Sequence, residues 1–151
     1  MKMKIVFISD THVELSLLRK VALKEFDASI FFHLGDSECS ADEIAPFCSV
    51  KGNCDSSLFH YPLSRNLLLP SGKRIFLRHI PFLAMEEYRA LKGEGFSYFV
   101  HGHTHKRRET KIEGMGIYCP GSLDFPRDGN YGSYLVLEAK EVGETFLFKT
   151  I

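Results

Sequence analysis

The stretch Ile5-Val6-Phe7-Ile8-Ser9-Asp10-Thr11-His12 joins an apolar run directly to a polar ending. Four consecutive apolar residues are typical of a short β-strand that is buried on both faces of a sheet. Asp10 and His12 then follow where this strand ends. Because open α/β sheets bind their ligands at the carboxyl ends of strands, the stretch predicts an α/β fold and the place of a site.

Short strands and helices are predicted along the rest of the chain. The strands are expected at residues 5–9, 29–34, 47–51, 66–69, 74–79, 97–100, 110–112, 116–118, 133–138 and 144–149. Helices are expected after a capping box at Thr11–Glu14, at 41–45 and at 84–91. Strands alternate with helices first and dominate later, which predicts an α/β sandwich of two facing sheets with helices outside.

Composition limits the class of protein. A chain of 151 residues with 44% hydrophobic and 25% charged residues suits one globular domain, expected over 1–151. Basic and acidic residues balance at 19 each, which argues against a nucleic-acid partner. No apolar run approaches the roughly 20 residues of a membrane helix, and no signal-peptide cleavage site follows the first strand. The four cysteines fit neither a zinc pattern nor a disulfide framework, so a cytoplasmic protein with reduced thiols is expected.

Short polar motifs recur at the ends of the predicted strands. They are Asp10-Thr11-His12, Gly35-Asp36, Gly52-Asn53-Cys54-Asp55, His79 and Gly102-His103-Thr104-His105. Each motif alone has an ordinary alternative as a turn, a strand terminus or a surface histidine. Chance placement of all five at strand ends is improbable, so they predict one shared site. Carboxylates, imidazoles and an amide suit Mn, Fe, Zn or Ni, and their number fits two metals that share a ligand.

The order Asp-x-His, Gly-Asp, Gly-Asn-x-Asp, His, Gly-His-x-His resembles the calcineurin-like metallophosphoesterases. The phrases ISDTH, HLGD, VKGNCD, GHTH and PGSLDFPR are similar to the small YfcE-type phosphodiesterases of bacteria and archaea, over residues 8 to about 127. The resemblance implies the metallophosphoesterase fold, an α/β/β/α sandwich of two mixed sheets. It assigns one metal to Asp10, His12, Asp36 and His105, and the other to Asp36, Asn53, His79 and His103, with Asp36 as the bridge.

The same resemblance implies an activity and its cofactors. The expected reaction is hydrolysis of a small phosphodiester by a hydroxide that bridges two divalent ions, with Mn2+ the first choice and Ni2+, Fe2+, Zn2+ or Co2+ as alternatives. Asp36, Asn53 and His103 are the catalytic candidates, and Asn53, Cys54 and Arg127 are weaker candidates for substrate contact. Relatives of this kind are often dimers or tetramers, so a homodimer or homotetramer is an expectation.

Departures from the family pattern bear on the substrate. Cys54 stands where many members have a histidine that protonates the leaving group, and a neutral thiol is a poor general acid. We therefore expect a preference for esters with good leaving groups. Cys54 equally suits a small packed residue. Val13 and Ile80-Pro81 also replace residues that are common in the family.

Two other functions compete with the phosphodiesterase. One is a catalytically weak protein-binding scaffold, similar to the retromer subunit of the same fold, which Cys54 keeps open. The other is a nuclease of the superfamily, which the short, neutral chain argues against. Three histidines match no motif and are expected to be structural: His33, His60 and His101.

Overall fold

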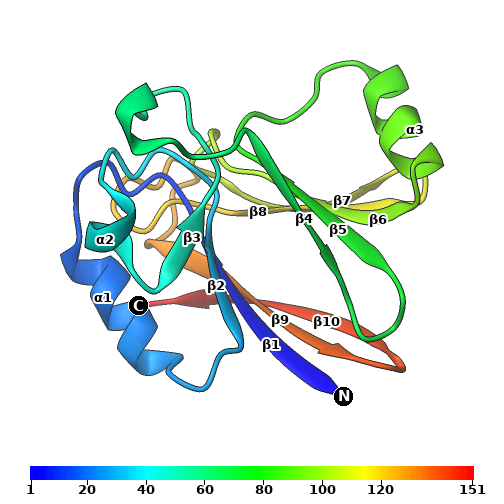
Figure 1. The fold of residues 1–151 in the computed structure, drawn as a ribbon, viewed down its shortest axis with the longest axis horizontal. Coiled ribbons are helices and arrows are strands. Elements are labelled where there is room, and N and C mark those ends of the chain that lie inside the picture. The colour runs from blue at the N-terminus through cyan, green and yellow to red at the C-terminus, as the bar shows by residue number, and fades with distance from the viewer.

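Two five-stranded sheets face each other in the computed structural model, which describes residues 1–151 (Figure 1). The strands of the first sheet are β1 (Lys2–Ile8), β2 (Ile30–His33), β3 (Phe47–Ser49), β9 (Ser133–Lys140) and β10 (Gly143–Thr150). Those of the second are β4 (Ser64–Leu68), β5 (Arg74–Arg78), β6 (Phe96–Val100), β7 (Arg107–Ile112) and β8 (Met115–Pro120). The helices are α1 (Ser16–Lys24), α2 (Ala41–Ile44) and α3 (Met85–Gly93), with a single 3-10 turn, η1 (Ser57–Phe59).

Both sheets are mixed. The first has the order β10-β9-β1-β2-β3, in which β1, β2 and β3 are parallel and β9 runs antiparallel to β1. The second has the order β4-β5-β6-β8-β7, in which β5, β6 and β8 are parallel and both edge strands are antiparallel. The expected α/β/β/α sandwich with two mixed sheets is confirmed.

The alternating faces of β1 build two layers of the core. Ile5 and Phe7 pack between the two sheets, whereas Val6 and Ile8 pack under α1 and α2. All four side chains are fully buried, as predicted for a strand covered on both faces. On the other side of the sandwich, α3 packs against the second sheet, as Figure 1 shows.

The predicted start of the first helix is wrong. Helix α1 begins at Ser16, and its N-cap residue Leu15 makes no side-chain capping bond. No helix can begin after Thr11 because His12 and Val13 have positive φ angles, and the Thr11 hydroxyl instead lies 2.9 Å from Nε2 of the buried His33. A capping box exists at α2 instead, between Ser40 and Glu43.

The hairpin of β7 and β8 is longer than predicted. Arg107 pairs with Pro120 at one end, and Ile112 pairs with Met115 at the other. The edge strand of this hairpin, β7, is exposed and polar, so its sequence has little hydrophobic periodicity. Only its last three residues were therefore predicted as a strand. The longest helices have nine residues, and no helix has the length and apolarity to cross a membrane.

Candidate metal centre

Five strands end at one place, and the polar residues that follow them meet there. Asp10 follows β1, Asp36 follows β2, and Asn53 follows β3 of the first sheet. His79 and the segment 103–105 follow β5 and β6 of the second sheet. The site therefore lies between the two sheets, at the carboxyl ends of their parallel strands.

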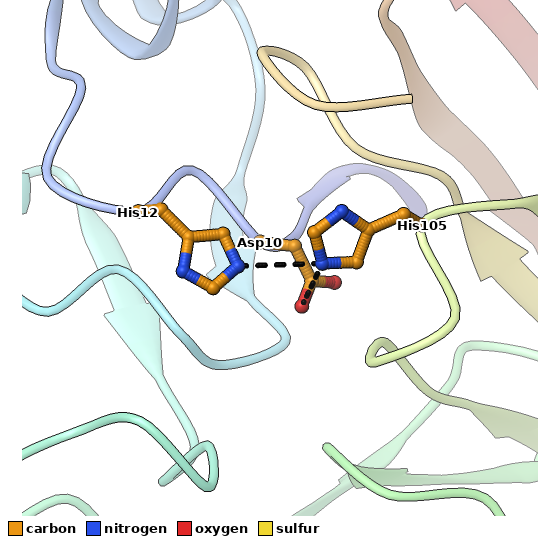
Figure 2. A group of neighbouring side chains, drawn as sticks. All are labelled: Asp10, His12 and His105. Carbon is orange, nitrogen blue, oxygen red and sulfur yellow. Dashed lines mark hydrogen bonds and ion pairs between the residues drawn. The ribbon is translucent and has the colours of Figure 1, made fainter. Parts of the chain in front are cut away.

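The first group of donors contains Asp10, His12 and His105 (Figure 2). Nε2 of His105 lies 3.3 Å from Nε2 of His12 and 3.4 Å from Oδ1 of Asp10. The ligating atoms of all three residues lie within 4.8 Å of one another. These residues come from segments more than 90 positions apart in the chain, so the fold itself assembles the group.

The second group contains Asp36, His79 and His103, with Asn53 beside them. Nε2 of His79 lies 3.1 Å from Oδ2 of Asp36 and 2.9 Å from Oδ1 of Asn53. Nδ1 of His103 lies 3.1 Å from the same Asn53 oxygen. Asp36 also lies within ligand distance of His12 and Cys54, so it stands between the two groups. All seven residues predicted as ligands are thus brought together.

Hydrogen bonds fix three of the imidazole rings. Nδ1 of His79 donates to the Leu34 carbonyl at 2.7 Å, and Nδ1 of His105 donates to the Phe125 carbonyl at 2.8 Å. Nδ1 of His12 donates to Glu38 at 2.8 Å. In each ring, Nε2 is left with its lone pair facing the site, the arrangement in which proteins hold metal-ligating histidines.

The polar atoms of the first group suit a cation. Oδ2 of Asp10 accepts hydrogen bonds from the Ser9 hydroxyl and the His103 amide, but Oδ1 is buried without a hydrogen-bond partner. Nε2 of His12 faces Nε2 of His105, and two lone pairs cannot bond to each other. A divalent cation would satisfy all three atoms, so the donors fit a metal.

The electrostatics of the site favour positive charge. Burial acts to raise the pKa of Asp36, but the hydrogen bond and charge of His79 outweigh it and hold that pKa at about 2. Burial acts to lower the pKa of His79, but Asp36 and Asp10 raise it above its usual range. The carboxylate of Asp10, 3.4 Å from Nε2 of His105, likewise raises the pKa of His105. Protons and metal ions therefore compete for the same atoms.

The backbone around the site is strained. Positive φ angles occur at Asp10 (55°), His12 (44°), Asp36 (62°), His103 (75°) and His105 (60°). Residues other than glycine adopt such angles rarely and at a cost, and they cluster at functional sites. Five of the seven predicted ligands have a positive φ angle. Neither the composition nor the periodicity of the sequence predicts these angles.

Glycine permits the loops to approach one another. A Cβ on Gly102 would lie 2.1 Å from the Ser9 hydroxyl and 3.0 Å from Oδ2 of Asp10. A Cβ on Gly52 would lie 2.1 Å from Oδ1 of Asp36. Both positions precede predicted ligands, so the glycines of the motifs create the space that the ligands need.

Sequence reasoning missed two supporting carboxylates. Glu38 orients His12 and lies outside every motif. The buried carboxylate of Asp55 accepts three backbone N–H groups, those of Asp36, Glu38 and Gly52. Asp55 therefore ties the β2 and β3 loops together. The place of Asp55 in the Gly-Asn-x-Asp motif indicated that it belongs to the site, but the sequence did not show which backbone N–H groups it binds.

The weaker substrate candidates lie at the edge of the site. Cys54 is exposed, and its backbone N–H donates to Oδ1 of Asp36 at 2.8 Å. Burial and the nearby Asp36 raise the pKa of its thiol. Arg127 lines a cavity of about 240 Å3 together with His12, His105 and Phe125.

The three histidines expected to be structural lie outside both groups of donors. His33 is buried against Thr11, and His101 is buried with its Nε2 accepting from Arg108. His60 ends the 3-10 turn η1 and is exposed. All four cysteines are free thiols.

Known proteins resemble this chain in sequence. It is 30% identical to the probable metallophosphoesterase YsnB of Bacillus subtilis (strain 168) over 155 residues, covering 97% of this chain and 90% of that protein. It is 32% identical to the phosphodiesterase YfcE of Escherichia coli (strain K12) over 96 residues, covering 60% of this chain and 51% of that protein.

Solved structures resemble the fold, and a family model covers most of the sequence. The Vps29 of Entamoeba histolytica, solved in complex with Zn2+, superposes with a TM-score of 0.73 at 20% identity, over 97% of this chain and 91% of that one. The model of the calcineurin-like phosphoesterase superfamily domain matches residues 3–142. The chain therefore belongs to the calcineurin-like phosphoesterase superfamily, and it is a phosphoesterase.

Proposed function

We propose that this phosphoesterase is a phosphodiesterase that hydrolyses small diesters with two divalent metal ions, Mn2+ before Ni2+, Fe2+, Zn2+ or Co2+. One observation carries the proposal: seven donors from five strand ends form two groups, and Asp36 stands between them. Asp10, His12, Asp36 and His105 would hold one ion. Asp36, Asn53, His79 and His103 would hold the other.

The ions would supply an activated water, shared between them as hydroxide, and would offset the negative charge that develops on the phosphoryl oxygens. The protein residues divide by burial. Asp10, Asp36, His79 and His105 are buried and form the floor of the site. Asn53 and His103 are exposed and face the side from which a substrate enters.

Two residues are suited to holding the phosphoryl group. The Asn53 amide turns its oxygen to His79 and His103, and its Nδ2 has only a 3.6 Å contact to the sulfur of Cys54. That nitrogen can donate to a phosphoryl oxygen. The guanidinium of Arg127, at the cavity beside His12 and His105, adds a fixed positive charge for an anionic substrate.

Protonation of the leaving group is the weak step. The raised pKa keeps the Cys54 thiol neutral at neutral pH and makes it a poor acid. Asp55 cannot replace it, because its carboxylate already accepts three backbone N–H groups. We therefore expect fast turnover of aryl esters and slow turnover of alkyl esters.

The test is hydrolysis of bis-p-nitrophenyl phosphate by chelator-stripped protein, with and without added Mn2+. Turnover should require the metal and disappear in Asp36→Ala. It should persist in Asp42→Ala, which removes an exposed carboxylate in α2 that makes no side-chain hydrogen bond or ion pair. Absence of turnover with Mn2+, Ni2+, Co2+ and Zn2+ in a folded protein would contradict the proposal.

A second function, a catalytically weak scaffold for another protein, is favoured by Cys54 and by the likeness to Vps29 in fold. The same assay separates the two functions. A folded, metal-binding protein without turnover on any diester would favour the scaffold.

A further inference from the structure

The segment that follows His79 exposes apolar side chains next to the metal centre. Ile80 is 40% exposed, Leu83 is 98% exposed and Met85 is 47% exposed. In Figure 1 this segment leaves the upper end of β5 and runs along the top of the molecule to α3. Several exposed apolar side chains on one short segment mark a binding surface more often than a packing defect.

A cavity of about 460 Å3 lies between this segment and the metal centre. Residues 80–83 form one wall, and His103 and Thr104 form another. The volume falls in the range of roughly 300–1,000 Å3 that is usual for small-molecule sites. Because His103 belongs to the second group of donors, whatever occupies the cavity lies directly beside the metal centre.

Aromatic packing holds one residue of the cavity wall, Phe82, in place. The Phe82 ring stacks on Phe99 with centroids 5.1 Å apart and meets the edge of Tyr88 at 5.5 Å. The Tyr88 hydroxyl donates to the Phe82 carbonyl at 2.8 Å. Phe82 is therefore a preformed apolar part of the cavity wall, which lowers the entropic cost of binding.

The charges at the cavity favour an uncharged occupant. Arg78 and Glu87 also line it, and their charges cancel. The Arg78 guanidinium lies over the face of the Phe82 ring, 4.6 Å from its centroid, so its charge is already engaged. A second phosphate would meet the Glu87 carboxylate without a free cation to balance it.

The cavity is also separate from the leaving-group side of the site. Cys54 occupies the motif position from which the leaving group would be protonated, and it does not line this cavity. The group that enters the cavity is therefore the ester arm that stays on phosphorus.

We propose that the cavity between Ile80–Leu83 and His103 binds an uncharged apolar ester arm of the phosphodiester, retained on phosphorus after hydrolysis, and that Ile80 and Leu83 determine this specificity. The proposal rests on the proposed phosphodiesterase function and narrows its substrates to diesters with one apolar arm.

The kinetic test compares two substrates with the same leaving group, phenyl p-nitrophenyl phosphate and methyl p-nitrophenyl phosphate. The measured quantity is the ratio of their kcat/KM values, phenyl over methyl, so that intrinsic reactivity cancels between variants. Burial of a phenyl ring against aliphatic side chains predicts that Leu83→Ser and Ile80→Ser each lower this ratio by about fivefold, mainly through KM.

A matched control is Leu68→Ser on β4, because Leu68 is 65% exposed and does not line the cavity. The control should keep the wild-type ratio. Since Leu83 is almost fully exposed, Leu83→Ser should fold like the parent. An unchanged ratio in both Ile80→Ser and Leu83→Ser would overturn the proposal.

A binding test does not depend on turnover. Methyl NMR spectra of the Zn2+-loaded protein are recorded with phenylphosphonate and with methylphosphonate, whose carbon–phosphorus bonds are not hydrolysed. The Ile80 and Leu83 methyl signals should shift with the phenyl compound and stay in place with the methyl compound. Turnover of both diesters with unmoved methyl signals would refute the apolar subsite alone. Failure to turn over either diester would refute the phosphodiesterase function itself.

Discussion

Replacing Gly52 by alanine should disable the metal centre while leaving the chain folded. The new Cβ would lie 2.1 Å from Oδ1 of Asp36 and 2.3 Å from its backbone nitrogen, where ordinary contacts begin near 3.4 Å. Gly52 has no positive φ, so alanine meets no backbone penalty there. The whole effect of the substitution is thus a displacement of Asp36, the residue between the two groups of donors.

The size of the effect follows from this clash. Relief requires the Asp36 carboxylate to move by more than about 1 Å, and misplacement by that amount costs about 100-fold in rate. Overpacking of this kind costs about 1–3 kcal/mol of the free energy of unfolding, less than the roughly 5–15 kcal/mol typical of a domain. We expect kcat/KM to fall by about 100-fold or more in a protein that still unfolds cooperatively.

Three measurements check this prediction: Mn2+ binding by calorimetry, hydrolysis of bis-p-nitrophenyl phosphate, and unfolding in urea. The control is Gly93→Ala at the end of α3, where the added Cβ meets nothing within 4 Å. It should keep metal affinity and activity. Wild-type metal affinity and turnover in a folded Gly52→Ala protein would refute the assignment of Asp36 as the shared ligand.

Three further predictions concern single residues. Glu38→Gln weakens the hydrogen bond that orients His12, so Mn2+ affinity measured by calorimetry should fall about 10- to 100-fold, and an unchanged affinity would contradict this role. Burial lowers the pKa of His33 from 6.5 to about 4, so its neutral form stabilises the fold fully above pH 6.5. About 3 kcal/mol should therefore be lost as pH falls from 6.5 to 4. Urea titrations between pH 6.5 and 4 should show a correspondingly smaller loss of unfolding free energy in His33→Gln than in the wild type. Equal losses in the two proteins would contradict this role of His33. Cys54→His should raise turnover of methyl p-nitrophenyl phosphate little but that of dialkyl diesters by about 10-fold or more, and equal gains on both would argue against a general-acid defect.

Local pattern predicted most of the fold. The apolar run of β1 and the hairpins of β4–β5 and β9–β10 formed as expected, because each depends on neighbours in sequence or on a turn signal. The capping box at Thr11–Glu14 did not form because His12 and Val13 have positive φ angles and the threonine hydroxyl contacts a distant residue, His33. Such competition between local and distant hydrogen bonds is invisible in one sequence.

The sequence predicted the donor residues of the candidate site, but it did not predict the groups that orient them. Placement at strand ends pointed to one shared site, because parallel strands of a sheet end on one side, and the resemblance to the metallophosphoesterases named the seven donors. The roles of Glu38 and of the Leu34 and Phe125 carbonyls depend on ring orientation, which no motif encodes. The single domain over 1–151 and the homodimer or homotetramer stay predictions.

The positive φ angles at five of the donors affect how this fold can evolve. A left-handed conformation costs a residue other than glycine about 1–2 kcal/mol of conformational free energy. The five donors therefore lower the stability of the fold, and their role in binding is the reason to keep them. In a lineage released from catalysis, glycine at the exposed His103 would both remove a donor and relax the backbone. Loss of the metal centre would then increase thermodynamic stability, and a more robust, inactive descendant lies one substitution away from the enzyme.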